Sequence, residues 1–263
     1  MQSYLICNIT AISKIIISFI FSIIIVPIIY LLKCVNYKIG KIRCFYMRGI
    51  LRIIRVKIVV KGKLSKSRPL LIASNHLSYI DILAYGSLAP IEFVSKKEVS
   101  NWPLIGFLAK LAGTVFIDRR RAKTLTARNE MEKKLSEGNI LLFFPEATSN
   151  NGIHILPFKS SLFEVVSNIS YSKITLQPAA IAFTHINELP IGFGWKSLFS
   201  WYGEIDFLKH LWNFLKLGLT TVEIRFLEPI KDGQSTDRKL LTSITENAVK
   251  NGMSDILSAR KLK

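Results

Sequence analysis

One histidine and one aspartate, five residues apart and directly after an apolar run, are the side chains best suited by type to move a proton. Residues 70–73 are unbroken and apolar, which predicts a strand buried on both faces. His76 then lies in the turn before a helix, the usual place for a catalytic group in an open α/β sheet. A histidine accepts a proton near neutral pH, and Asp81 can hold its other ring nitrogen. The alternative is a structural histidine beside an acid that interacts only with the helix dipole.

Ser78, between these two residues, is the obvious candidate for a nucleophile. Nothing like the GxSxG sequence of a serine hydrolase surrounds it. With Asp81 three residues further on, it instead imitates the capping box that starts a helix. We therefore interpret Ser78 as a helix cap.

The composition favours a membrane protein. The 263 residues suffice for one catalytic domain plus an extra element. A net charge of +18 suits nucleic acid or an anionic membrane surface, and the 49% hydrophobic residues favour the membrane. No zinc-ligand spacing, RNP-like motif or helix-turn-helix pattern supports nucleic acid as a partner. The cysteines, Cys7, Cys34 and Cys44, form no CxxC pair, which predicts reduced thiols and no metal site.

Residues 15–32 carry no charge and are bounded by Lys14 and Lys33, so this run is just long enough to span a bilayer. Pro27 lies inside it, so the run either spans as one helix or bends into a hairpin that re-enters the same leaflet. A signal peptide fits less well, because the run is long and no small-x-small cleavage site follows it. Eight Lys or Arg residues follow between positions 33 and 57, which predicts a cytoplasmic location for the bulk of the protein.

Residues 41–52 mix basic and apolar side chains and predict a helix that lies near lipid headgroups or packs on the domain. We expect a membrane-associated segment over 1–54 and a catalytic domain over 55–263. In that domain strands and helices alternate, which indicates an α/β sheet covered by helices. Strands are predicted at 56–60, 70–74, 91–95, 114–117, 140–144, 175–183 and 222–227, and helices at 78–87, 103–112, 120–136, 158–166 and 235–257. The aromatic-rich stretch 192–218 either lies at the membrane–water boundary or forms an aromatic core insert.

Four blocks in order, over about a hundred residues, resemble the motifs of the glycerolipid acyltransferase family, which includes bacterial 1-acylglycerol-3-phosphate acyltransferases. Residues 75–81 (NHLSYID) resemble its NHxxxxD block. Residues 93–119 look like its KxEL…P…G…G…FIDR block, 144–149 (FPEATS) are similar to FPEGTRS, and 176–181 (LQPAAI) resemble the VxPVAI type.

The resemblance implies a mixed sheet flanked by helices, with an N-terminal membrane helix or helical hairpin, at the inner membrane of a bacterium. It also implies transfer of an acyl group from acyl-ACP or acyl-CoA to a lipid hydroxyl, without cofactor or metal. His76 is then the base that takes the hydroxyl proton, and Asp81 holds its other nitrogen. The hydroxyl attacks directly, so no acyl-enzyme is needed.

The same resemblance implies the substrate-binding residues. Arg119, Glu146 and Thr148 are expected to hold the acceptor, Lys96 is a candidate for contact with donor or acceptor, and Asn75 belongs to the same set. Arg119 can fork two hydrogen bonds to a phosphate, and Glu146 can accept one from a glycerol hydroxyl.

Two departures stand in the third block. Ala147 replaces a glycine, a mild change unless the backbone needs positive φ, and Ser149 replaces an arginine. The second change removes a cation, for which Arg120, Arg121 or Lys159 could substitute. We expect 1-acylglycerol-3-phosphate as acceptor, with phosphatidate as product. The alternatives are a lyso-ornithine lipid or another lysophospholipid, and a non-catalytic membrane-binding protein, against which the intact histidine–aspartate pair counts.

Overall fold

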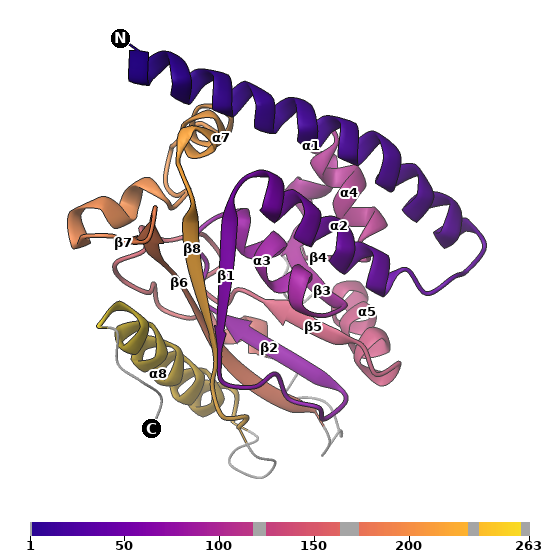
Figure 1. Ribbon diagram of the computed structural model, residues 1–263. Helices are drawn as coiled ribbons and strands as arrows, with labels where there is room; N and C mark the ends of the chain where they lie inside the picture. The colour runs from indigo at the N-terminus through magenta and orange to yellow at the C-terminus, as the bar shows by residue number, and fades with distance from the viewer. Residues whose placement is uncertain (1, 118–124, 164–173, 231–236, 259–263) are drawn as a thin grey trace.

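The computed structural model (Figure 1) describes residues 2–117, 125–163, 174–230 and 237–258. The strands are β1 (Val56–Lys61), β2 (Leu70–Ser74), β3 (Ile91–Lys96), β4 (Val115–Ile117), β5 (Ile140–Phe143), β6 (Thr175–Ile186), β7 (Leu189–Pro190) and β8 (Thr220–Phe226). The α-helices are α1 (Gln2–Cys34), α2 (Gly40–Ile53), α3 (Ile80–Leu88), α4 (Ile105–Leu111), α5 (Leu125–Ser136), α7 (Phe207–Lys216) and α8 (Arg238–Leu257).

The described strands form one mixed sheet in the order β1-β8-β6-β2-β5-β3-β4, with β7 paired to β6. Strands β6, β2, β5, β3 and β4 run parallel to one another, and β8 runs antiparallel to β6. The carboxyl ends of the parallel strands therefore meet at one edge of the sheet, where ligands bind in open α/β folds. The predicted α/β class with a mixed sheet is confirmed, and β1 is an edge strand as expected.

Strand β2 lies in the middle of this sheet and is buried on both faces. Leu70 and Ile72 pack into a core shared with helices α3 and α7, whereas Leu71 and Ala73 pack into a second core with α5 and α8. Figure 1 shows α8 on one side of the sheet and α2 with α3 on the other. The unbroken apolar run at 70–73 reflects this burial on two sides.

Helix α1 runs without interruption through Pro27, and the chain then turns back into α2. Among the described residues, one helix, over Cys7–Cys34, is long and apolar enough to cross a membrane. The lysines that bound the apolar run contact the domain: Lys14 donates to the carbonyls of Leu215 and Leu217 at the end of α7, and Lys33 donates to the carbonyls of Lys110 and Leu111 at the end of α4. Helix α1 therefore contacts the domain at both limits of its apolar run.

Helix α2 packs on the domain, which was one of the two interpretations of residues 41–52. Cys44, Met47 and Leu51 are buried, whereas Phe45 is exposed on the other side of the helix. Contact of that exposed side with lipid stays a prediction. The expected boundary at residues 54–55 falls between α2 and β1.

Two predicted helices differ from the structure. The helix expected over 103–112 is α4, which begins at Ile105, because the preceding residue Leu104 has a φ of +61°. The helix expected over 158–166 is the 3₁₀ turn η3 (Ser160–Phe163) in its described part, since the backbone N–H groups of Phe158 and Lys159 donate to Glu246 and Pro145. The expected helix over 120–136 is described only from Leu125 onward.

The aromatic-rich stretch 192–218 divides between the two interpretations. Phe199 and Phe214 belong to the core, whereas Phe193 and Trp195, on the 3₁₀ helix η4 (Phe193–Leu198), are 63% and 66% exposed. The core insert is therefore correct for the first pair. The exposed pair keeps the prediction of a membrane–water boundary.

Candidate active site

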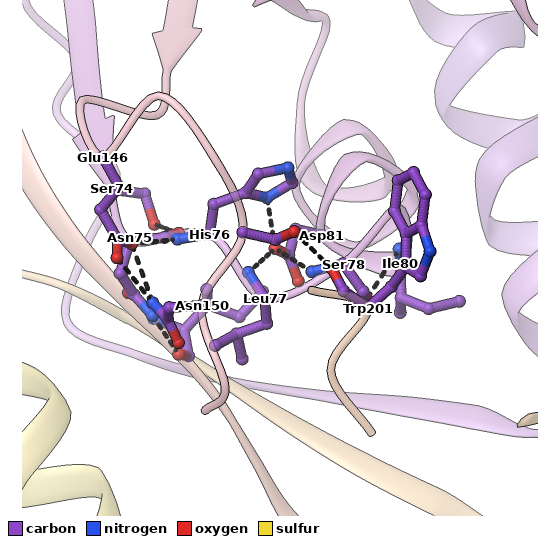
Figure 2. A network of polar contacts seen from close by, with 12 residues as sticks. Ser74, Asn75, His76, Leu77, Ser78, Ile80, Asp81, Glu146, Asn150 and Trp201 are labelled. Atoms are coloured by element: carbon purple, nitrogen blue, oxygen red, sulfur yellow. Dashed lines mark hydrogen bonds and ion pairs between the residues drawn. The ribbon is translucent and has the colours of Figure 1, made fainter. Parts of the chain in front are cut away.

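The histidine–aspartate pair forms at the carboxyl end of β2 (Figure 2). His76 Nδ1 lies 2.8 Å from Asp81 Oδ2, and that oxygen also accepts hydrogen bonds from the backbone N–H groups of Leu77 at 2.6 Å and Ser78 at 3.0 Å. Three N–H donors therefore converge on one oxygen of a buried carboxylate. Because a carboxylate only accepts, Nδ1 is the donor in this contact, and in the neutral ring the lone pair is then on Nε2.

The His76 ring is held from two sides. Phe144, directly after β5, stacks on it with ring centroids 4.0 Å apart and planes 15° apart. The side chain of His76 is 21% exposed, whereas Asp81 is fully buried. Nε2 can therefore take up a proton from a bound group while the ring cannot turn freely.

The local sequence explains how the loop reaches this geometry. The Ser78 hydroxyl accepts from the N–H of Ile80 at 3.2 Å, and Asp81 accepts from the N–H of Ser78. The interpretation of Ser78 as a cap is confirmed only in part, because α3 begins at Ile80 with Tyr79 as its N-cap, and the N–H of Asp81 donates to the Ser78 carbonyl and not to its hydroxyl. Ser78 is fully buried, which does not suit a nucleophile that must meet substrate.

Glu146 lies behind the histidine and faces inward. Its Oε1 accepts from the backbone N–H of His76 at 2.7 Å, its Oε2 accepts from that of Leu156 at 2.7 Å, and the Asn150 amide donates to both oxygens. The side chain is 2% exposed, and burial raises the pKa of Glu146 to about 7 despite these hydrogen bonds. In this geometry the carboxylate joins the histidine loop to the third block.

Asn75 joins the same loop to the neighbouring strand. Its amide nitrogen donates to the carbonyl of Ile181 and its amide oxygen accepts from the N–H of Ile181, both at 2.9 Å. Asn75 is fully buried, so the amide extends the pairing of β2 with β6 past the end of the regular register. Binding of substrate by Asn75 and Glu146 stays a prediction, while their visible contacts position His76.

The remaining expected binding residues differ in their surroundings. Thr148 is exposed in the loop after Glu146, and Lys96 is half-buried at the carboxyl end of β3, on the same edge of the sheet. Arg119, with Arg120 and Arg121, falls outside the described residues. The structure thus brings His76 and Asp81 together with the third block, and it leaves the phosphate contacts as predictions.

Both departures in the third block have structural consequences. Ala147 has a φ of +62°, so its backbone occupies the left-handed region that favours glycine. The Ser149 hydroxyl donates to the carbonyl of Trp201, and the N–H of Trp201 donates to the carbonyl of Leu77 at 2.9 Å. Where an arginine would reach outward, Ser149 attaches the segment around Trp201 to the histidine loop.

The sequence did not predict Phe144, Asn150 or Trp201 as residues of the site. Phe144 lies in the third block and Asn150 directly after it, so proximity to a motif was the available signal for both. Trp201 is 52 residues from Ser149, and nothing local in the sequence connects the two.

Comparison with known proteins agrees with this geometry. The Acyltransferase family model matches residues 55–182. A lyso-ornithine lipid O-acyltransferase from Brucella abortus is 34% identical over 243 residues, covering 90% of this chain and 91% of the relative. A 1-acyl-sn-glycerol-3-phosphate acyltransferase from Neisseria meningitidis is 28% identical over 211 residues, covering 79% of each.

A solved structure shows the same fold. The crystal structure of the 1-acyl-sn-glycerophosphate acyltransferase PlsC from Thermotoga maritima matches with a TM-score of 0.70 at 18% identity, covering 99% of this chain and all of the other. The similarity to the Brucella relative extends over 90% of this chain, and the family model matches the part that holds the four sequence blocks and the histidine–aspartate pair. The chain therefore belongs to the glycerolipid acyltransferase family.

Proposed function

We propose that this acyltransferase uses His76 as the general base for a lysolipid hydroxyl. The observation that carries the proposal is the 2.8 Å contact between His76 Nδ1 and Asp81 Oδ2 on a ring that is 21% exposed, which leaves Nε2 to face a bound hydroxyl. The hydroxyl oxygen attacks the thioester carbonyl as Nε2 takes its proton. The carbon–sulfur bond then breaks, and the imidazolium returns the proton to the leaving thiolate. Asp81 stabilises the imidazolium in between.

The acceptor we favour is a lyso-ornithine lipid. The Brucella relative of that name is 34% identical, whereas the Neisseria 1-acyl-sn-glycerol-3-phosphate acyltransferase is 28% identical. Ser149 supports the same choice, because it removes a cation that would suit a phosphate monoester and instead contacts Trp201. This order reverses the one expected from the sequence.

The second candidate is 1-acylglycerol-3-phosphate. The match of fold with the Thermotoga enzyme and the family's second block, which here includes Arg119, both support it. Acyl-ACP and acyl-CoA are both retained as donors.

An acceptor panel tests these proposals. Purified full-length protein in detergent receives labelled acyl-ACP or acyl-CoA, together with lyso-ornithine lipid, 1-acylglycerol-3-phosphate or lysophosphatidylethanolamine. We expect transfer with at least one donor and a higher kcat/KM for lyso-ornithine lipid than for the phosphate monoester. A higher value for 1-acylglycerol-3-phosphate would overturn the choice of acceptor. Absence of transfer to every acceptor would overturn the proposed reaction.

We also propose that the protein lies at the cytoplasmic side of a bacterial inner membrane, with α1 and α2 as a hairpin in one leaflet. Lys14 and Lys33 bound the apolar run of α1, yet both contact the same domain. An apolar run that crossed the bilayer would put these two lysines on opposite sides. The basic residues that follow α1 support the cytoplasmic side.

Thiol labelling tests this topology. One variant keeps the exposed Cys34 and carries Ser at positions 7 and 44, and a second has no native cysteine and carries Ser3→Cys. We expect an impermeant maleimide to label both in inside-out vesicles and neither in right-side-out vesicles. Labelling of the Ser3→Cys variant from the periplasmic side would instead support a spanning helix.

A further inference from the structure

Four aromatic residues form a cluster beside the catalytic loop. They are Tyr79, Trp102, Trp201 and Phe207, called here the aromatic cluster. The ring centroid of Trp201 lies 6.2 Å from that of Tyr79, 6.0 Å from that of Trp102 and 5.5 Å from that of Phe207. Trp102 is 36% exposed and the other three are half-buried, so the cluster reaches the surface.

The aromatic cluster adjoins His76. Tyr79 belongs to the same loop, and the backbone N–H of Trp201 donates to the carbonyl of Leu77, the residue after His76. In Figure 2 the His76 imidazole and the Trp201 indole, which come from two different segments, both extend toward the top of the view. A headgroup attached to a hydroxyl at His76 would therefore be near these rings.

The polar atoms of the aromatic cluster already have protein partners. The indole N–H of Trp201 donates to the carbonyl of Ile205 at 2.7 Å, and the Tyr79 hydroxyl lies 3.1 Å from His210 Nδ1. A ligand would therefore meet the exposed parts of the rings, of which Trp102 is 36% exposed, and an aromatic face attracts a cation. Recognition by ring faces selects a cationic group and gives nothing to a phosphate.

The charge of the segment points the same way. The chain as a whole carries a net charge of +18, yet residues 201–207 (WYGEIDF) contain Glu204 and Asp206 and no lysine or arginine. Ser149, which stands where the family pattern has an arginine, attaches this segment to the catalytic loop through the Trp201 carbonyl. A segment with two acidic residues and no lysine or arginine is thus attached to the residue that stands where the family pattern has an arginine.

We infer that the aromatic cluster, with the acidic segment 201–207, is the subsite for the side-chain ammonium of a zwitterionic acceptor headgroup. The inference rests on the proposed function, because it concerns the acceptor of the same reaction. The ammonium lies against the ring faces of Trp201 and Trp102, with Glu204 adding a long-range attraction. Ser149 sets the specificity by holding Trp201 in place without adding a positive charge.

The sharpest test changes the acceptor and leaves the protein intact. The side-chain amine of lyso-ornithine lipid is acetylated, which removes the charge and keeps the reacting hydroxyl and the acyl chain. We expect kcat/KM for the acetylated acceptor to fall between about twofold and thirtyfold, the range of an exposed to a desolvated cation–π contact. Equal kcat/KM for the two acceptors would overturn the inference while leaving the proposed function intact. Absence of transfer to both would instead overturn the proposed function.

Variants locate the effect. In Trp201→Leu and Trp102→Leu the difference between the free and acetylated acceptors should shrink toward one, and Glu204→Gln should reduce it less. Trp212→Leu is the matched control, because Trp212 lies on α7 outside the aromatic cluster with Lys216 over its ring at 5.0 Å, so the difference should persist. Unchanged ratios in both cluster variants, or an equal loss in the control, would overturn the assignment of the subsite.

Substitution at Ser149 separates attachment from charge. Ser149→Ala removes the contact with Trp201, and Ser149→Arg also introduces the cation of the family pattern. We expect the arginine variant to shift the kcat/KM ratio toward 1-acylglycerol-3-phosphate by more than the alanine variant does. A shift toward lyso-ornithine lipid in the arginine variant would contradict the inference.

Discussion

Two neighbouring regions of the molecule use their polar groups differently. The first, called here the strand edge, is at the carboxyl ends of β2 and β5, and the second is the segment 201–207. At the strand edge, Asp81, Glu146 and Asn75 are buried and each is held by two or more hydrogen bonds from the backbone or a neighbouring amide. The segment presents half-exposed aromatic rings and is attached to the edge through the carbonyl and N–H of Trp201. The strand edge is held by hydrogen bonds among its own residues, whereas the segment 201–207 is held to it by the hydrogen bonds of Trp201.

This difference teaches where each property of the enzyme resides. A buried network with this many hydrogen bonds tolerates little change, and in the proposed reaction it would hold the proton-transfer geometry that any acceptor needs. A half-exposed segment can change its side chains without disturbing that network. Substitutions at the strand edge should therefore lower the rate for all acceptors alike, whereas substitutions in the segment should alter the ratio between acceptors.

The largest expected effect among the supporting residues is that of Asp81→Asn. The asparagine amide is uncharged and accepts weaker hydrogen bonds than the carboxylate from His76, Leu77 and Ser78. The tautomer of the imidazole is then no longer fixed. We expect kcat to fall by roughly 10²–10⁴ for every acceptor with their ratio unchanged, as steady-state rates on two acceptors would show. A loss below tenfold, or a changed ratio, would break the division between the two regions.

Glu146→Gln should have the next largest effect. The amide nitrogen of glutamine would face N–H donors from Asn150 or Leu156 and leave one of them unpaired, which costs about 1–3 kcal/mol of folding free energy. The loop that carries His76 then loosens, and we expect kcat to fall by about tenfold for both acceptors. Thermal unfolding in detergent and initial rates measure the two effects. An unchanged rate together with lowered stability would limit Glu146 to folding.

The pH dependence of stability gives a second readout of Glu146. Burial raises the pKa of this carboxyl from 4.5 to about 7, so between these values the folded protein binds more protons at this group than the unfolded chain. Its contribution to stability is present at low pH and is lost as pH rises through 7. The stability of wild type relative to Glu146→Gln should therefore be greater at pH 5 than at pH 8, by on the order of 3 kcal/mol. An equal difference at both values would contradict the raised pKa.

Ala147→Gly should have the smallest effect and the opposite sign. A φ of +62° strains alanine and suits glycine, so the substitution relieves about 1 kcal/mol, partly offset by the freer unfolded chain. We expect a rise in Tm of a few degrees or less with unchanged kcat for both acceptors. A lower Tm would show that the alanine methyl group makes packing contacts that outweigh the strain.

Local spacing predicted much of the strand edge. The apolar run at 70–73 predicted β2 because a strand buried on both faces has no polar positions, and the spacing of His76, Ser78 and Asp81 fits one turn into a helix. The order of the four blocks predicted that the third block would meet the first. Glu146 was expected to face the acceptor, and only the tertiary structure shows that its oxygens are used by His76, Asn150 and Leu156.

The segment 201–207 could not be placed from the sequence. The segment is attached through a hydrogen bond from Ser149 to the carbonyl of Trp201, 52 residues away. Every residue has a backbone carbonyl, so the sequence does not indicate which one accepts. The same is true of α1, where Lys14 and Lys33 contact carbonyls at the ends of α7 and α4. In the sequence the two lysines marked only the limits of an apolar run.

The rate of acyl transfer by His76→Ala tests the central claim most directly. The variant is purified in the detergent used for wild type, its unfolding temperature is compared, and labelled transfer to lyso-ornithine lipid and 1-acylglycerol-3-phosphate is followed. The account predicts a folded protein whose kcat falls by roughly 10²–10⁴ for whichever acceptors the wild type uses, with their ratio preserved. Transfer at the wild-type rate by a folded His76→Ala variant would contradict it.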